Sequence, residues 1–182
     1  MKVLVVVDMQ NDFIDGALGT SEAKAIVDNV VKRIEDSRGE LILFTKDTHQ
    51  KGYLETREGK KLPVVHCLEG TEGWEINEKV KKAWVENEDT IVSTKLCENT
   101  FCKPVFGSVE LAEFLKFYCC VLKEIELVGV CTDICVISNA IMLKNTLPEV
   151  DIRVNASCCA GVTPQSHQEA LNVMKMCQID VV

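Results

Sequence analysis

Two cysteines in one short segment have the type and spacing that nucleophilic chemistry needs. Residues 129–136 read GVCTDICV, so Cys135 follows a strand-like run and a Thr-Asp pair and stands at the start of an apolar helical pattern, with Cys131 in the preceding turn. The dipole and free N–H groups at a helix N-terminus favour the reactive thiolate, and the same N–H groups can bind a developing oxyanion. This spacing favours Cys135 over Cys131 as a nucleophile.

A carboxylate and an ammonium group follow two other apolar runs. Asp8 ends the run 3–7, and Lys95 ends the run 90–94. With the thiol, these side chains are the parts needed for nucleophilic catalysis at a carbonyl carbon. The alternative is that Asp8 only caps a loop and that the cysteines are small buried apolar side chains.

A second group of side chains could bind a metal ion. Asp47 and His49 are two residues apart, and side chains at i and i+2 of an extended segment share a face. With His66 they form a donor set that suits Zn, Fe or Mn. An Asp-x-His pair alone is a weak signal. We expect the remaining histidine, His167, to be a surface residue of the last helix.

These groups can act together only if the fold brings them to one place. Apolar runs predict strands, and 3.6-residue periodicity predicts helices, with Ser21 as a possible cap and Gly39 as a possible end of the first helix. Strands are expected at 3–7, 41–45, 90–94, 124–130, 152–155 and 179–182, helices at 21–34, 75–84, 108–117, 133–144 and 164–177, and long loops at 47–73 and 95–107.

Strands that alternate with helices predict an α/β fold with a mainly parallel sheet of about six strands in a three-layer αβα arrangement. Ligands of such sheets bind beyond the carboxyl ends of the strands. The strand ends at Asp8, Asp47 and Lys95 and the segment that ends at Cys135 would meet at that edge.

Length and composition limit the class of protein. The 182 residues, 47% of them hydrophobic, fit one globular domain spanning 1–182. A formal net charge of -8 disfavours a nucleic-acid partner. We expect no membrane association and a cytoplasmic location, because no apolar run reaches the roughly 18 residues of a span and no signal peptide is recognisable. Most of the 10 cysteines are expected to be reduced thiols.

Several of these segments together resemble the isochorismatase-like cysteine hydrolases, in particular the nicotinamidase/pyrazinamidase branch. The resemblance covers essentially the whole chain, with the motifs in the family's order. It rests on VVVDMQNDF at 5–13, TKDTH at 45–49, PVVHC at 63–67 followed by Gly70 and Thr71, Lys95 with Phe101, GVCTDICV at 129–136 and, more loosely, ASCCA at 156–160.

The resemblance implies a catalytic triad of Asp8, Lys95 and Cys135. Cys135 would attack the substrate carbonyl and form a thioester, while Asp8 moves protons and Lys95 holds Asp8 ionised. The oxyanion hole would consist of the backbone N–H groups of Cys131 and Cys135. The resemblance also implies a cis peptide bond between Val130 and Cys131.

The resemblance further implies one divalent metal ion bound by Asp47, His49, His66 and a fourth ligand. Its spacing favours Glu58 as that ligand over Glu55. The metal ion would bind the pyridine nitrogen of the substrate and orient the ring. The pocket would be lined by Phe13, Phe101, Ile134 and Leu18, although ordinary core packing is the better interpretation of Leu18. Val64 and Val65 stand where many nicotinamidases have an aromatic residue, so the pocket would be less stacked.

The leading functional hypothesis is hydrolysis of nicotinamide to nicotinate and ammonia, as part of NAD salvage, by a homo-oligomer. A second hypothesis is hydrolysis of another small amide, an N-carbamoyl compound or a ureide, although the branches that hydrolyse carbamoyl groups generally lack the combination of Asp-x-His and a second histidine. Isochorismatase itself cleaves a vinyl ether without a cysteine nucleophile, and Cys135 argues against that activity. A redox-sensing thiol protein is a further class, but such a sensor would not need Asp8, Lys95 and the histidines together.

Overall fold

A computed structural model describes residues 1–87 and 98–182. Within these residues a sheet of six strands has the order β3-β2-β1-β4-β5-β6. Every strand pairing in it is parallel, as the alternation of strands and helices predicted. The strands are β1 (Lys2–Val7), β2 (Leu41–Asp47), β3 (Thr100–Lys103), β4 (Glu124–Val130), β5 (Asp151–Ala160) and β6 (Asp180–Val181).

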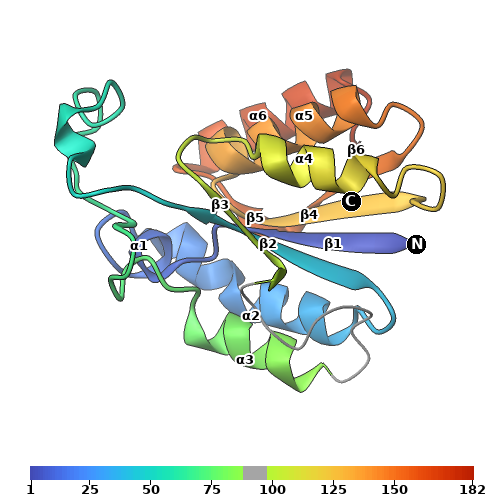
Figure 1. The fold of residues 1–182 in the computed structure, drawn as a ribbon, viewed down its shortest axis with the longest axis horizontal. Coiled ribbons are helices and arrows are strands. Elements are labelled where there is room, and N and C mark those ends of the chain that lie inside the picture. The colour runs from blue at the N-terminus through green and yellow to red at the C-terminus, as the bar shows by residue number, and fades with distance from the viewer. Residues whose placement is uncertain (88–97) are drawn as a thin grey trace.

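Helices cover both faces of the sheet and complete three layers, with α4, α5 and α6 on one face and α2 and α3 on the other (Figure 1). The α-helices are α1 (Asn11–Ile14), α2 (Ser21–Glu35), α3 (Glu78–Glu86), α4 (Val109–Lys116), α5 (Ile137–Thr146) and α6 (Pro164–Met176). A 3-10 turn, η1 (Tyr53–Glu55), lies in the long connection after β2, and a π-helical turn, η3 (Thr132–Val136), leads into α5. No helix in the described parts of the chain has the length and apolar character to cross a membrane.

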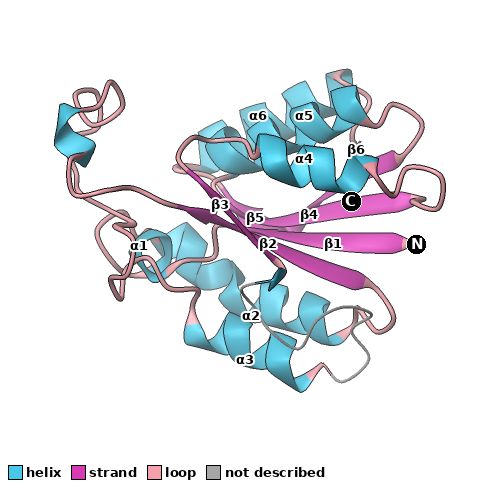
Figure 2. Ribbon diagram, viewed as in Figure 1, coloured by secondary structure: helices cyan, strands magenta, loops and turns pink. Residues whose placement is uncertain are grey.

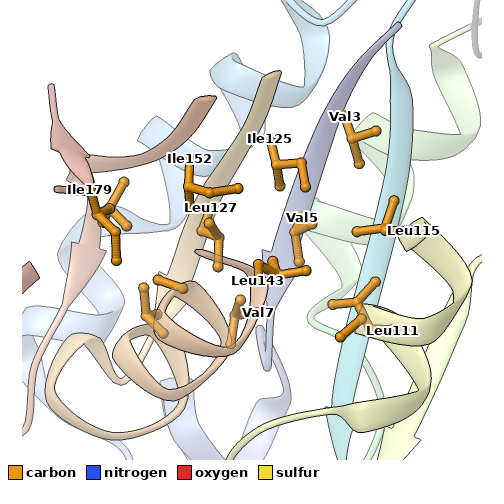
Figure 3. Packing of buried hydrophobic residues seen from close by; sticks show 14 of the residues in the cluster. Val3, Val5, Val7, Leu111, Leu115, Ile125, Leu127, Leu143, Ile152 and Ile179 are labelled. Carbon is orange, nitrogen blue, oxygen red and sulfur yellow. The ribbon is translucent and has the colours of Figure 1, made fainter. Parts of the chain in front are cut away.

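The central strand β1 is buried on both faces because its side chains alternate between two cores. Val3, Val5 and Val7 pack with α4, α5 and α6, and Figure 3 shows them among Leu111, Leu143 and residues of β4 and β5. Leu4 and Val6 pack on the other face with α2 and α3. Burial on both faces explains the continuous apolar run of this strand. It also fixes the place where Asp8 leaves the sheet.

Helix starts are set by side-chain caps. Thr20 rather than Ser21 caps α2, since its hydroxyl accepts the N–H of Ala23 at 3.0 Å. The helix ends at Glu35, ahead of Gly39. Ser108 caps α4. These caps satisfy N–H groups that the first turn leaves without intrahelical partners.

Several sequence-based boundaries differ from the structure within the described residues, and two of the differences concern strands of the sheet. The expected loop 95–107 contains β3, because Thr100–Lys103 pairs with the carboxyl half of β2. β5 runs on to Ala160, past the expected end at Asn155, with an irregularity opposite Leu127–Gly129. The strand expected at 90–94 lies outside the described residues. For β3 and for the second half of β5, pairing with the neighbouring strand forms a strand where local composition gives only a weak signal.

Candidate active site

The carboxyl ends of four adjacent strands bring the chemical groups together. In register, Val7 lies beside Thr45 on one side and Gly129 on the other, and Asp47 lies beside Lys103. The long connection between β2 and α3 extends beyond this same edge (Figure 2). The strand ends and the start of this connection therefore meet at one edge, where ligands of open parallel sheets bind.

Asp8 forms the centre of the site. Its backbone has a positive φ of 48°, and its side chain is fully buried. The hydroxyl of Thr45 donates to Oδ1 at 2.6 Å, and the ammonium of Lys103 lies 2.6 Å from Oδ2. These contacts fix the orientation of the carboxylate.

Lys103 connects Asp8 to the other groups of the site. Its Nζ lies 3.4 Å from Sγ of Cys135 and 3.7 Å from a carboxylate oxygen of Asp47. The side chain is 2% exposed, so this is a desolvated ammonium. Lys95, which the sequence analysis chose for this role, lies outside the described residues.

Sequence reasoning missed Lys103 because it expected a loop where β3 lies. The run 90–94 has more β-branched residues than Thr100–Lys103, and for that reason the sequence analysis expected the strand there. A signal was nevertheless present: Thr100–Lys103 is a short strand that ends in a lysine and is followed by Pro104, which cannot continue a ladder. The rule that polar groups stand at strand ends, applied to this strand, selects Lys103.

Cys135 lies in the turn between β4 and α5. The peptide bond Val130–Cys131 is cis, which confirms what the resemblance implied. The π-helical turn then carries Cys135 toward Asp8, and Asn139 holds this turn from α5. Its Nδ2 donates to the carbonyl of Cys135 at 2.8 Å, while its Oδ1 accepts the N–H of Ser108 at 2.9 Å.

The electrostatics of the site require a base beside the thiol. Burial raises the pKa of Cys135 well above its ordinary value, and the carboxylate of Asp8 raises it further against the opposing charge of Lys103. This direction is opposite to the expectation that the helix N-terminus stabilises the thiolate. Burial also raises the pKa of Asp8, with Lys103 opposing the change. A basic carboxylate beside a neutral thiol is arranged to accept its proton.

The remaining groups keep defined charges. Burial would lower the pKa of Lys103, but Asp8, Cys135 and Asp47 outweigh burial and raise it, so the side chain stays an ammonium. Burial raises the pKa of Cys131 to about 12. Cys131 is therefore a neutral thiol, as Cys135 is, and what distinguishes Cys135 is the contact of its Sγ with Nζ of Lys103 at 3.4 Å.

Asp47, His49 and His66 form a buried cluster that could hold a metal ion. One ligand atom from each of the three lies within 4.8 Å of the others. Oδ2 of Asp47 is 2.9 Å from Nε2 of His49 and 3.4 Å from Nε2 of His66. Glu58 approaches the cluster with Oε1 3.7 Å from Nε2 of His49, whereas Glu55 is exposed.

The atoms of this cluster fit a cation. Nδ1 of His66 lies 2.8 Å from the carbonyl of Val64, which favours a proton on Nδ1 and leaves the lone pair of Nε2 for a metal ion. Nε2 of His49 is buried and faces Oδ2 of Asp47 at 2.9 Å, so its ring nitrogen and the carboxylate point to the same place. Burial favours the neutral acid of Asp47, but the neighbouring imidazoles and Lys103 hold its pKa well below the ordinary value.

Two residues that sequence reasoning did not select position this cluster. Gln10 is fully buried: its Oε1 accepts the N–H of Asp47 at 2.7 Å, and its Nε2 donates to the Asp47 carbonyl at 2.9 Å. Tyr53 is 2% exposed, and its ring centroid lies 4.4 Å from that of His49 and 5.0 Å from that of His66. Gln10 stands in the VVVDMQNDF motif, so a signal for it was present.

Comparison with known proteins agrees with this geometry. The sequence profile described as Isochorismatase domain matches residues 2–182. The chain belongs to the isochorismatase family. A Bacillus subtilis isochorismatase family protein named PncA is 27% identical over 176 residues, which cover 94% of this chain and 92% of the relative.

Solved structures of similar proteins share the isochorismatase-family fold. A Bacillus subtilis nicotinamidase/pyrazinamidase PncA superposes with a TM-score of 0.81 at 25% identity, covering 100% of this chain and 98% of that one. The pyrazinamidase of Pyrococcus horikoshii, solved in complex with zinc, gives a TM-score of 0.76 at 26% identity with the same coverage, 100% and 98%.

The residues expected to line the pocket of this isochorismatase-family chain have different surroundings. The ring of Phe13 meets that of His66 edge-on, with centroids 5.7 Å apart, and is partly exposed. Ile134 is partly exposed in the Cys135 turn. Phe101 is 9% exposed and packs against Phe114, 5.3 Å between centroids, within the core beside α4. Phe13 and Ile134 are thus available to a substrate, and Phe101 supports the strand that carries Lys103.

His167 is not the simple surface residue that the sequence analysis expected. Its Nδ1 lies 2.8 Å from the hydroxyl of Thr132, a fully buried residue of the turn that carries Cys135. The side chain is partly exposed, and sequence reasoning missed its contact because helical periodicity alone does not reveal that this part of α6 packs against that turn.

Proposed function

We propose that this chain is a metal-assisted cysteine amidohydrolase that converts nicotinamide to nicotinate and ammonia. One observation carries the proposal: a buried Asp8–Lys103–Cys135 constellation adjoins a buried Asp–His–His cluster, and Lys103 contacts Asp47 as well as Asp8. A nucleophile and a ring-binding site are thus side by side. Nicotinamidases and pyrazinamidases among the similar structures support the choice of substrate.

The first half-reaction forms a thioester. Asp8 accepts the proton of the Cys135 thiol as sulfur attacks the amide carbonyl carbon, and the C–N bond breaks after Asp8 passes the proton to the leaving nitrogen. Ammonia leaves, and the acyl group stays on sulfur. Backbone N–H groups of Cys131 and Cys135 are the proposed donors to the oxyanion.

The second half-reaction regenerates the enzyme. Asp8 takes a proton from a water molecule as its oxygen attacks the thioester carbonyl, and the C–S bond breaks. The proton returns to sulfur, and the carboxylic acid leaves. The ammonium of Lys103 stabilises negative charge at Asp8 and sulfur throughout, and so we assign to Lys103 the role that the sequence analysis gave to Lys95.

The metal centre is proposed to comprise Asp47, His49 and His66, with Glu58 as the fourth protein group. A divalent cation, zinc in the first instance with iron or manganese as alternatives, would supply a Lewis acid for the pyridine nitrogen of the substrate. Phe13 and Ile134 then border the ring. The corresponding biological role is NAD salvage in the cytoplasm, and we propose a homo-oligomer as the working form.

Another small amide, an N-carbamoyl compound or a ureide is the second candidate substrate class. Val64 and Val65 stand in place of an aromatic residue and favour a pocket with less ring stacking. Such a pocket would also accept a substrate without an aromatic ring. Both substrate classes use the same thioester chemistry, so substrate comparison separates them.

Ammonia release from nicotinamide tests the proposal. The wild type should release ammonia, Cys135→Ala should not, and the exposed-thiol control Cys177→Ala should match wild type. Chelation should abolish release, and added zinc should restore it. If metal-loaded wild type releases none, the nicotinamide assignment is wrong; release that persists in Cys135→Ala would refute the cysteine mechanism.

A further inference from the structure

We propose that His167 is a positioning residue that holds the turn carrying Cys135 in its reactive geometry. This turn, residues 131–135, is called here the nucleophile turn. The inference rests on the proposed function in one respect, namely that Cys135 is the attacking group. It assigns to α6, which contributes no group to the proposed chemistry, a defined part in that chemistry.

The central contact joins His167 to the middle of the nucleophile turn. The hydroxyl of Thr132 lies 2.8 Å from Nδ1 of His167, and Thr132 is fully buried. Thr132 directly follows Cys131, whose N–H is a proposed oxyanion donor, and precedes Cys135 by three residues. A polar group without access to water needs a partner, and this imidazole supplies one for the Thr132 hydroxyl.

A second contact holds the next residue of the turn to the same part of the chain. The carboxylate oxygens of Asp133 accept the N–H of Val162 at 3.1 and 3.3 Å. Val162 precedes α6, and a Cβ on neighbouring Gly161 would lie 2.9 Å from the backbone of His167. The absent side chain at Gly161 therefore lets the segment 161–167 approach closely enough for both contacts.

These contacts position residues of the proposed thioester chemistry and do not involve the Asp47–His49–His66 cluster. Asp47, His49 and His66 lie on β2 and the connection after it, whereas His167 and Thr132 lie on α6 and the turn after β4. Loss of the His167 contact should let the nucleophile turn move relative to the substrate carbonyl. Oxyanion donors act through their fixed placement, so such freedom should lower kcat while KM stays the same.

The test compares four single variants and one double variant. His167→Leu and Thr132→Val remove the contact, and each should lower kcat about tenfold with KM changed less than about twofold. His167→Asn keeps a polar atom near the position of Nδ1 and should recover most of the loss. The double variant should be no worse than the poorer single variant. Gln168→Leu, on the exposed side of the same helix, is the matched control and should behave as wild type.

A second readout does not depend on any substrate. The rate of Cys135 alkylation by iodoacetamide, located by peptide mass mapping, should change in His167→Leu and Thr132→Val and remain as in wild type for Gln168→Leu. If wild type fails on nicotinamide, this readout alone decides: altered alkylation supports the proposal and unchanged alkylation overturns it. With active enzyme, an unchanged kcat in His167→Leu overturns it, as does a loss that His167→Asn does not recover.

Discussion

At the scale of single residues, one ammonium group joins the two halves of the site. Nζ of Lys103 contacts Asp8 at 2.6 Å, Cys135 at 3.4 Å and Asp47 at 3.7 Å. Its positive charge is balanced by two carboxylates, which keep it protonated despite burial. The lysine thereby couples the nucleophile to the proposed metal centre.

Replacement of this lysine should nearly abolish activity. Lys103→Met removes the partner of the buried Asp8 carboxylate, and we expect ammonia release to fall about a hundredfold or more. Lys95→Met, the matched control, should stay within about twofold of wild type. Steady-state kinetics with circular dichroism as a folding check measure both variants. A large loss of activity in Lys95→Met with near-normal activity in Lys103→Met would show that Lys95 is the catalytic lysine, as the sequence analysis expected.

Gln10 should control metal affinity without being a ligand. Both backbone groups of Asp47 bind its amide, so Gln10→Leu should weaken zinc binding about 10- to 100-fold, as loss of outer-shell partners does. Competition with a chromophoric chelator measures the affinity. Asn29→Leu removes an exposed amide that donates to Ser157 far from the cluster and should leave affinity unchanged. Wild-type affinity in Gln10→Leu would contradict this role.

At the scale of elements, the strands that sequence analysis located best are those buried on both faces. The expected bounds of β1 and β4 match the observed ones closely. β1 is apolar from Val3 to Val7 because burial on both faces leaves little room for polar residues, and β4 has its two glutamates in its first half. The edge strand β3 has four residues and mixes polar with apolar types, so its pattern is weak. Of the site, Asp8, Asp47 and Cys135 follow from strand ends that the pattern marks. Lys103 follows from the same rule only once β3 is recognised, and the contacts of Asn139 depend on tertiary packing that the pattern does not encode.

The contact between α2 and β4 should make stability depend on pH. Burial would raise the pKa of Glu126, but hydrogen bonds from Arg33, at 2.9 and 3.2 Å, and its charge outweigh burial and lower it. Because the folded-state pKa lies below the unfolded value of about 4.3, this stabilisation is fully present above that pH. It should be lost as pH falls through the folded-state pKa.

Glu126→Gln tests this contribution. We expect the free energy of unfolding at pH 7 to fall by about 1–3 kcal/mol, as for loss of hydrogen bonds to a charged group. The decline of stability in acid should also become shallower than in wild type. Urea unfolding across pH 3–7 measures both effects, with the exposed Glu149→Gln as control. Identical pH profiles for Glu126→Gln and wild type would show that the pair contributes nothing.

At the scale of the whole molecule, two cores on opposite faces of one parallel sheet support the strands whose ends carry the site. The three-layer class was predictable because strand and helix patterns alternate along the chain. The projecting connection after β2 was predictable only as a long loop, because no periodic pattern in the sequence indicates the contacts of Tyr53 and Glu58 with His49. The assignment of residues 1–182 to one domain stays a prediction.

Metal loading should stabilise the whole fold, because a ligand that binds only the folded state raises the unfolding temperature by mass action. Adding zinc to chelator-treated protein should raise Tm, and the rise should disappear in His66→Ala. His167→Ala removes a histidine outside the Asp47–His49–His66 cluster, so it should keep the zinc-dependent rise. Differential scanning fluorimetry across zinc concentrations measures the shifts. An equal rise in His66→Ala would place the bound metal elsewhere.

The central claim is that Cys135, activated by Asp8 and Lys103, carries the acyl group. Its most direct test is acid quenching of metal-loaded enzyme during turnover of nicotinamide, followed by intact-protein and peptide mass spectrometry. We predict a nicotinoyl adduct on the peptide containing Cys135 that hydroxylamine removes and that is absent from Cys135→Ala. An adduct on another residue, or turnover by Cys135→Ala at the wild-type rate, would contradict the account.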